Sequence, residues 1–285
     1  MATETALVSG VTKEPGVSGM PRLVIQNSLG RAHLYLHGAT LTHFEPAGER
    51  PVIFVSRQAV YENAKPIRGG VPICWPWFGP HPSDSSKGPH GYARLSEWSV
   101  ASTAQMTDGS TRVALSIKLD LAELQYEVTV GRSLTMKLTT KNTTATPLTI
   151  TEALHTYLSI GDIRQISVEG LAGSDCVDRL TNVRTKQDAT PIRIAAEVDR
   201  TYLNTTSAAT LVDPVFNRRI TVSKRGSKST VVWNPWIEKS KVLNDLADDE
   251  YFGFVCIETA NALDNAVTIA PGESHEIEAQ VAIAK

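Results

Sequence analysis

The alternation of apolar and polar residues is the feature that most constrains the fold of this chain. From Arg112 to Asp120 the sequence reads RVALSIKLD, and from Tyr126 to Asn142 it reads YEVTVGRSLTMKLTTKN. A period of two places alternate side chains on opposite faces of a β-strand. Similar segments recur along the chain: TPLTITEALHTYLSI, RRITVSKRG, STVVWNP, YFGFVCIET and HEIEAQVAIA. Gly, Pro, Asn and Asp bound these segments, which predicts an all-β fold, a large antiparallel β-sandwich.

Helical patterns are scarce. Ser56–Asn63 and Ile237–Tyr251 are the two segments for which we expect a short helix. The chain has 285 residues and carries neither a low-complexity linker nor an internal repeat. Because all-β folds often reach this size as one domain, we expect a loose N-terminal arm over residues 1–20 and a single β-sandwich domain over residues 21–285.

Charge and cysteine content narrow the class of protein. The formal net charge is −2 and the pI is about 6.4, which favours neither nucleic acid nor a membrane surface as partner. The three cysteines are odd in number and lack metal-ligand spacing, so we expect free thiols in a reducing compartment. The N-terminus shows no signal-peptide pattern, and no apolar run approaches the roughly 20 residues that span a bilayer. We therefore expect a cytoplasmic monomer.

The run IRGGVPICWPWFGPH, from Ile67 to His81, has an unusual composition. It is too rich in Gly and Pro for a helix, and its prolines disfavour an interior strand. It is also too apolar for an ordinary surface loop. Either the run is a packed irregular plug, or it lines a pocket with flat rings and the guanidinium of Arg68. The pair Gly69–Gly70 would allow a sharp turn or a close approach to a ligand.

Two short motifs place ionisable groups near turns. PHGYAR contains His90 and Arg94, and EVDRTY contains Asp199. Taken singly, each residue favours a structural role, in a turn for His90 and Arg94 and in a surface salt bridge for Asp199, over a functional one. Trp233 and Trp236, in VVWNPW, could offer flat faces to a sugar, although tryptophans are more often simply packed.

Two further ionisable residues lie within predicted strands. His155, in TEALHTYLSIG, is expected on the same side of its strand as Ala153 and Tyr157, and a lone strand histidine is usually structural. Glu258, in YFGFVCIETAN, is expected on the same strand face as three apolar residues: Phe252, Phe254 and Cys256. A buried glutamate is rare unless it is paired, because its charge loses hydration there. The functional and structural interpretations of Glu258 are therefore nearly even.

Six motifs, taken together in order and spacing, resemble those of the hexose-6-phosphate mutarotases. They are IRGGVPICWPWFG, HGYAR, EALHTYLSIGDI, EVDRTYLN, VVWNPWIEKSKVLNDLADDEY and VCIETAN. These enzymes are also called glucose-6-phosphate 1-epimerases and form a branch of the aldose 1-epimerase superfamily. The resemblance extends from about Pro21 to the C-terminus.

This resemblance implies a fold and a set of site residues. The implied fold is a β-sandwich of the galactose-mutarotase type, with the sugar in a cleft on one sheet, which makes residues 21–285 the catalytic domain. The implied catalytic residues are His155 and Glu258. The implied substrate-binding residues are Arg68, His90, Arg94 and Asp199. Pro89 departs from the pattern, because many members carry a glutamine before His-Gly.

The residue types suit anomer interconversion. Opening a cyclic hemiacetal requires the C1 hydroxyl to lose a proton while the ring oxygen gains one, and a base and an acid on opposite sides of the ring would serve both steps. We assign Glu258 as the base and His155 as the acid, which requires His155 to be cationic at the start. A nearby carboxylate, Glu258 or Asp199, would favour that cation. The reaction involves no redox change, and the sequence carries no nucleotide-binding or metal-ligand motif, so we expect no cofactor and no metal.

The arginines address substrate choice, because a guanidinium binds phosphate oxygens bidentately. Arg68 and Arg94 are the first candidates for the phosphate, with Arg57 and Lys65 in reserve. We therefore expect a small-molecule sugar phosphate, chiefly glucose 6-phosphate, as substrate.

Two alternatives stay open at this stage. The first is an aldose 1-epimerase that acts on unphosphorylated hexoses. The second is a non-catalytic sugar-binding module. The distance between His155 and Glu258 in the folded protein distinguishes an enzyme from the non-catalytic module. Side chains that lie far apart, or on different faces of a sheet, could not act together on one sugar.

Overall fold

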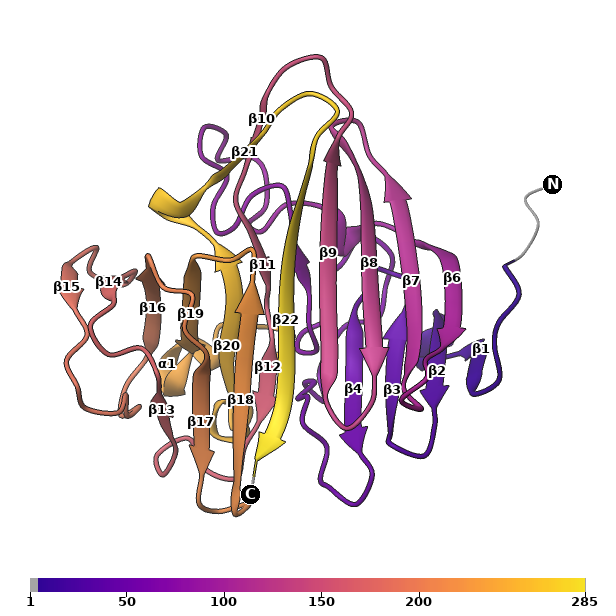
Figure 1. Ribbon diagram of the computed structural model, residues 1–285. Helices are drawn as coiled ribbons and strands as arrows, with labels where there is room; N and C mark the ends of the chain where they lie inside the picture. The colour runs from indigo at the N-terminus through magenta and orange to yellow at the C-terminus, as the bar shows by residue number, and fades with distance from the viewer. Residues whose placement is uncertain (1–4, 285) are drawn as a thin grey trace.

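Two eight-stranded antiparallel sheets pack against each other in the computed structural model, which describes residues 5–284 (Figure 1). The outer sheet has the order β13 (Ser167–Glu169), β17 (Ala209–Asp213), β18 (Arg218–Arg225), β22 (Ser274–Ala284), β9 (Leu134–Asn142), β8 (Ala122–Val130), β7 (Thr111–Lys118) and β6 (Ser99–Gln105). The inner sheet has the order β15 (Arg184–Lys186), β14 (Asp175–Asp178), β16 (Val198–Leu203), β19 (Ser229–Asn234), β20 (Phe254–Asn261), β11 (Glu152–Leu154) and β5 (Ile73–Cys74). β12 (Tyr157–Ser159) also pairs with β20.

Smaller elements cover the ends and edges of these sheets. A four-stranded sheet contains β1 (Val11–Pro15), β2 (Pro21–Gln26), β3 (Gly30–Tyr35) and β4 (Leu41–Pro46), and β10 (Leu148–Ile150) pairs with β21 (Val267–Ile269). The described helices are α1 (Trp236–Ser240) and the 3₁₀ turns η1 (Val17–Gly19), η2 (Ala93–Leu95), η3 (Glu250–Gly253) and η4 (Leu263–Asn265). Within residues 5–284, no helix has both the length and the apolar character needed to cross a bilayer.

The outer sheet confirms the predicted alternation. In β8 the side chains of Leu124, Tyr126 and Val128 are buried in the core, while the residues between them are exposed or half-buried. This pattern is the one expected of a strand with one face on an apolar core and one face toward water. The all-β sandwich predicted from the sequence is therefore confirmed.

β20 differs from the outer strands because all of its residues are buried. Val255 and Ile257 belong to the large core between the sheets, whereas Phe254 and Cys256 pack on the opposite face, against Tyr157. Both faces of this central strand are therefore covered. The second face is the one that carries the cavity described below.

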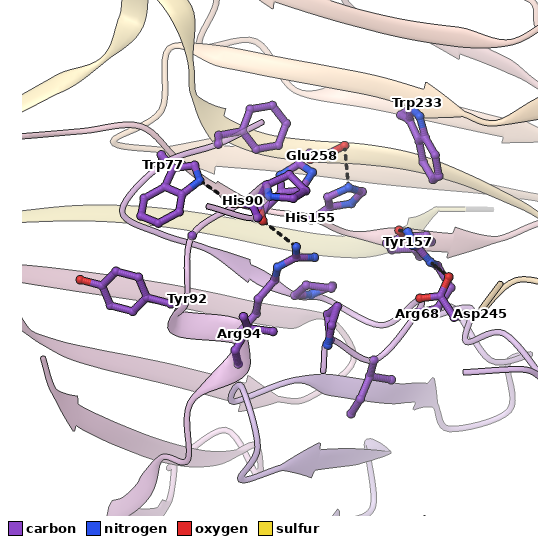
Figure 2. Close-up of a pocket in the computed structure, with 18 of the residues that line it drawn as sticks. Arg68, Trp77, His90, Tyr92, Arg94, His155, Tyr157, Trp233, Asp245 and Glu258 are labelled. Atoms are coloured by element: carbon purple, nitrogen blue, oxygen red, sulfur yellow. Dashed lines mark hydrogen bonds and ion pairs between the residues drawn. The ribbon is translucent and has the colours of Figure 1, made fainter. Parts of the chain in front are cut away.

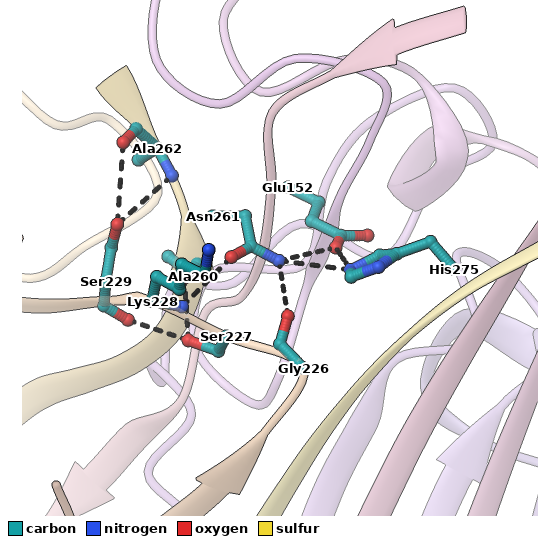
Figure 3. A network of polar contacts seen from close by, with 9 residues as sticks. All are labelled: Glu152, Gly226, Ser227, Lys228, Ser229, Ala260, Asn261, Ala262 and His275. Carbon is teal, nitrogen blue, oxygen red and sulfur yellow. Dashed lines mark hydrogen bonds and ion pairs between the residues drawn. The ribbon is translucent and has the colours of Figure 1, made fainter. Parts of the chain in front are cut away.

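A buried polar network joins the two sheets at the end of β20 (Figure 3). Asn261 donates to a carboxylate oxygen of Glu152 at 3.0 Å and to the carbonyl of Gly226 at 2.8 Å. The same carboxylate oxygen of Glu152 lies 2.9 Å from Nε2 of His275 on β22. A buried carboxylate needs such partners, and here they come from both sheets. The network therefore fixes β11 and β20 relative to the outer sheet.

The expected N-terminal arm, residues 1–20, contains β1, which instead pairs along its whole length with β2. Before β1, the backbone N–H of Val8 donates to the hydroxyl of Thr103 on β6 at 2.9 Å. These contacts attach this part of the arm to two sheets. Residues 1–4 of the expected arm lie outside the described residues.

The helix expected over Ser56–Asn63 does not form. The Ser56 hydroxyl and the Arg57 backbone N–H both donate to the carboxylate of Glu250, at 2.6 and 2.8 Å. This contact with a distant residue overrides the local helical pattern. The helix expected over Ile237–Tyr251 is correct in part, since α1 and η3 occupy its two ends and turns connect them.

The Trp-rich run proves to be partly plug and partly pocket wall. Trp75 is fully buried, whereas Trp77 and Phe78 are half-buried and line a cavity. The backbone of the next loop docks directly on Trp75, where Tyr92 N–H donates to the Trp75 carbonyl at 2.9 Å. Gly91 has φ +66°, and a Cβ there would lie 1.9 Å from the same carbonyl oxygen. Glycine is therefore required for the loop that carries His90 and Arg94 to lie this close.

This close approach gives a stability prediction. Gly91→Ala should lower the free energy of unfolding by more than about 2 kcal/mol, because it adds a backbone clash to the cost of a positive φ. Gly272→Ala is the matched control, since Gly272 has φ +78° but no atom within 4 Å of an added Cβ. The control should cost about 1 kcal/mol. Equal midpoints for the two variants in urea denaturation would contradict the proposed role of Gly91.

Candidate active site

A cavity of about 880 Å³ lies on the exposed side of the inner sheet (Figure 2). Its floor comes from β16, β19 and β20, and its walls come from the Trp-rich run, the loop around η2 and the turns after α1. The six site residues expected from the sequence all line it: Arg68, His90, Arg94, His155, Asp199 and Glu258. The fold therefore brings together residues that are scattered over most of the chain.

His155 and Glu258 face each other at the floor of the cavity, with 3.5 Å between Nε2 and Oε1. Glu258 is on β20 and is 1% exposed, while His155 is 8% exposed. His155 lies in the two-residue break between β11 and β12, not inside a continuous strand as expected. Its backbone N–H donates to the Pro72 carbonyl at 3.1 Å. This break lets the imidazole turn toward β20. The apolar row before Glu258 begins at Phe254, because Phe252 lies in η3.

The environment of this pair favours its uncharged forms. Burial raises the pKa of Glu258 well above its ordinary value, and the nearby Asp199 raises it further. Burial likewise lowers the pKa of His155 well below its ordinary value. Neighbouring groups lower the His155 pKa further, in the order His90, Arg94 and Arg68.

These shifts favour a protonated carboxyl beside a neutral imidazole in the ligand-free site. This differs from the cationic His155 expected from the sequence. A single nearby carboxyl does not offset the loss of hydration and the positive charges on the other side of the ring. One oxygen of Glu258 and Nδ1 of His155 are buried without a hydrogen-bond partner, so both groups have unused bonding capacity.

His90 is a neutral hydrogen-bond donor to the cavity. Its Nδ1 accepts from the backbone N–H of Gly79 at 3.2 Å, so the ring proton resides on Nε2. Burial lowers the pKa of His90 to about 3, and Arg94 and Arg68 contribute to that shift. Its ring lies edge-on to that of His155, with 5.6 Å between centroids. A sugar oxygen is a suitable acceptor for this N–H.

Arg68 is already neutralised and holds a chain of contacts that ends on His155. Its Nε donates to Asp245 at 3.0 Å, and Nη1 donates to the Tyr157 hydroxyl at 3.2 Å. The Tyr157 ring stacks on the His155 ring, with 4.9 Å between centroids and 13° between planes. Neither Asp245 nor the contact with Tyr157 was predicted from the sequence. These contacts restrict the orientation of the imidazole.

Arg94 presents the opposite case. Its Nη2 donates to the Pro89 carbonyl at 2.7 Å, while its Nε is buried without a partner. Among residues 5–284, no carboxylate lies within salt-bridge distance of Arg94. Burial lowers its pKa, as expected for a cation that has lost hydration. The guanidinium is therefore a partly buried cation that lacks a counter-ion.

Asp199 lies on β16 opposite Trp233 of β19, at the far side of the floor. Burial raises its pKa to about 6, and Arg179 opposes this shift. At neutral pH a large share of this carboxylate is therefore ionised and able to accept hydrogen bonds from sugar hydroxyls.

Of the remaining candidates from the sequence, Trp233, Trp236, Arg57 and Lys65, one lines the cavity and three do not. Trp233 lines the cavity, whereas Trp236 packs against Tyr251 outside it. The two reserve cations do not line the cavity either: Arg57 pairs with Asp249 and Lys65 pairs with Glu62. Lys239, which was not predicted, reaches the cavity rim.

Cys256 lies close to the pair, and one donor atom from each of Cys256, His155 and Glu258 falls within 4.8 Å of the others. Burial raises the thiol pKa well above its ordinary value, and Glu258 raises it further. The mechanism proposed below draws on His155 and Glu258 of this cluster and uses no metal.

Comparisons with known proteins identify the family of this chain. The family model described as aldose 1-epimerase matches residues 21–282. An Escherichia coli K12 protein named "Putative glucose-6-phosphate 1-epimerase" is 33% identical over 267 residues, which cover 90% of this chain and 88% of that protein. A Cenchrus ciliaris protein of the same name is 31% identical over 275 residues, which cover 90% of this chain and 82% of that protein.

The fold comparison leads to the same group. A crystal structure from Salmonella typhimurium, described as "a putative mutarotase", superposes with a TM-score of 0.91 at 25% identity and covers 99% of this chain and 96% of that chain. The sequence match and the fold agree with the resemblance found in the sequence. This chain belongs to the aldose 1-epimerase family.

Proposed function

We propose that this protein interconverts the α and β anomers of hexose 6-phosphates, chiefly glucose 6-phosphate. The observation that carries the proposal is the 3.5 Å approach of His155 to Glu258 at the floor of a cavity that also holds the unpaired cation Arg94. An acid–base pair suits the anomeric centre, and a guanidinium suits a phosphate. The names of the two relatives support the same substrate.

The reaction needs one proton to leave O1 while another reaches the ring oxygen O5. Both oxygens are bonded to C1, so the acid and the base belong side by side. The opposite-side arrangement expected from the sequence is therefore not needed, and a 3.5 Å separation is suitable for two groups that face one carbon. Glu258 takes the proton from O1, His155 gives a proton to O5, the C1–O5 bond breaks and an aldehyde forms. Rotation about C1–C2 and the reverse transfers produce the other anomer.

The other cavity residues orient the sugar in this proposal. Arg94 binds the phosphate, and the His90 N–H donates to a sugar oxygen. Asp199 accepts hydrogen bonds from hydroxyls, and Trp233 offers an apolar face to the ring. Arg68 is placed to meet a sugar hydroxyl or the phosphate while it keeps Tyr157 against His155.

Of the two alternatives, the non-catalytic module is disfavoured, because it gives no reason to bury a carboxyl against an imidazole. An epimerase for unphosphorylated hexoses would share the acid–base pair but not the need for an unpaired Arg94. We further propose that the enzyme works as a cytoplasmic monomer without cofactor, metal, nucleic acid or membrane.

Replacing the proposed acid gives the first functional prediction. His155→Asn should lower anomerisation of glucose 6-phosphate by about 10²–10⁴-fold, because one positioned proton transfer is lost. Exchange NMR between the two anomers measures this rate above the spontaneous background. His43→Asn, on β4 in the four-stranded sheet, is the matched control and should keep wild-type activity. Wild-type turnover by His155→Asn would reject the assignment.

Substrate preference gives the second prediction. The ratio of kcat/KM for glucose 6-phosphate to that for glucose should be well above one and should fall as salt is added, because ions screen the attraction between phosphate and guanidinium. Polarimetry at low and high sodium chloride measures this ratio. A ratio of one at every salt concentration would instead favour the epimerase for unphosphorylated hexoses.

The buried carboxyl gives a pH prediction. Above the ordinary glutamate pKa of 4.5, the unfolded chain releases the Glu258 proton while the folded protein retains it, so stability is lost as pH rises toward the folded-state pKa. Glu258→Gln removes this loss. Its stability advantage over wild type in urea denaturation should therefore grow as the pH rises from acidic to neutral. A difference independent of pH would show that Glu258 is not held protonated.

A further inference from the structure

The groups around His155 are unevenly charged, and the asymmetry centres on Arg94. Toward His155, β20 presents the protonated carboxyl of Glu258 and the thiol of Cys256, and β12 presents the Tyr157 ring. The Arg68–Asp245 pair lies beside Tyr157, and the neutral His90 and the unpaired Arg94 complete the surroundings of His155 (Figure 2). On β16, the carboxyl of Asp199 also acts on Glu258 and raises its pKa.

This arrangement creates a difficulty for the proposed chemistry. If Glu258 is the base and His155 the acid, their shared proton must reside on His155 when the sugar ring opens. Burial opposes that arrangement in the empty site, and the positive charge of Arg94 is among the neighbouring groups that add to this effect. A negative group that pairs with Arg94 would therefore favour the competent form of the pair.

We propose that the phosphoryl group of the substrate activates the acid–base pair as well as anchoring the sugar: once it pairs with Arg94, the proton of Glu258 moves to His155. This inference rests on the proposed function. The proton leaves the Glu258 oxygen and binds Nε2 of His155, so the pair keeps one proton and becomes a carboxylate beside an imidazolium. A phosphate dianion carries close to two negative charges, more than enough to offset one guanidinium.

The size of the effect follows from the interaction of close charges. An opposite charge brought near a titratable group shifts its pKa by about 1–3 units, so we expect at least about a tenfold rise in the population of the competent form. The gain appears in the chemical step, because the phosphate alters the protonation of the groups that react. A hexose without phosphate would bind to a pair that remains largely in the neutral arrangement. Specificity would then lie in kcat as well as in KM.

Separating the phosphoryl group from the sugar tests this proposal. Xylose is glucose without its C6 carbon, so it has the anomeric centre but no place for the phosphate. Anomerisation of xylose is measured by exchange NMR with and without phosphite dianion, at constant ionic strength set with chloride. Enzyme-free samples correct for catalysis by the buffer ions. Anomerisation of glucose 6-phosphate is measured on the same enzyme preparations.

The expected result is that phosphite raises the enzymatic kcat for xylose at least about tenfold. Arg94→Gln should abolish this activation, lower the rate on glucose 6-phosphate and raise the rate on xylose without phosphite, because the opposing charge is gone. Arg219→Gln, on β18 of the outer sheet, is the matched control and should behave like wild type. If Arg94 only anchors the phosphate, the Arg94→Gln variant should anomerise xylose at the wild-type rate.

The failures are distinguishable. An enzyme that does not anomerise glucose 6-phosphate would overturn the proposed function itself. The proposed function would stand if the enzyme is fully active on glucose 6-phosphate. If phosphite inhibits that reaction, and therefore binds, yet leaves the kcat for xylose unchanged, only the proposed activation of the acid–base pair by phosphate is overturned. If phosphite does not bind, the test is the rate at which Arg94→Gln anomerises xylose without phosphite. A rate equal to or below that of the wild-type enzyme would reject the proposal.

Discussion

The burial of one carboxyl against one imidazole is the constraint on which the rest of the site depends. Glu258 is on the central strand β20, where every residue is buried, and it meets His155 at 3.5 Å. In such a place desolvation opposes the charged forms, which raises the pKa of Glu258 and lowers the pKa of His155. The pair still carries one proton and one vacant site for a proton. That is what a reaction requires if it adds a proton to one oxygen and removes a proton from its neighbour.

Some groups around the pair are held by contacts within the protein, whereas Arg94 lacks a charged partner among the described residues. Arg68 is neutralised by Asp245 and supports Tyr157, which in turn stacks on His155. Gly91 holds the neighbouring loop against the Trp75 carbonyl. Arg94 emerges from that same loop without a carboxylate partner among residues 5–284, although its Nε is buried. A site with one cation left unpaired is complementary to an anion that arrives with the substrate, and this links substrate choice to the state of the catalytic pair.

The sequence predicted the strands well, because the period of two in segments such as Tyr126–Asn142 is a local signal. The resemblance identified six residues that line the cavity, but the residues alone left their roles open. The sequence failed to predict features that depend on contacts between residues far apart in the chain. Ser56 and Arg57 bind Glu250 and do not form the expected helix, and Arg68 binds Asp245. The direction of the His155 pKa shift could not be read from the sequence for the same reason, since its burial and its neighbours His90 and Arg94 are properties of the folded chain.

The central claim is that Glu258 and His155 share one proton that resides on the carboxyl in the ligand-free enzyme. Heteronuclear NMR of protein labelled with ¹³C at glutamate carboxyls and ¹⁵N at histidine rings tests this directly, with Glu258→Gln and His155→Asn assigning the two signals. At neutral pH the account predicts a protonated carboxyl and a neutral imidazole for these two residues. A carboxylate signal for Glu258 together with an imidazolium signal for His155, in the absence of any ligand, would contradict it.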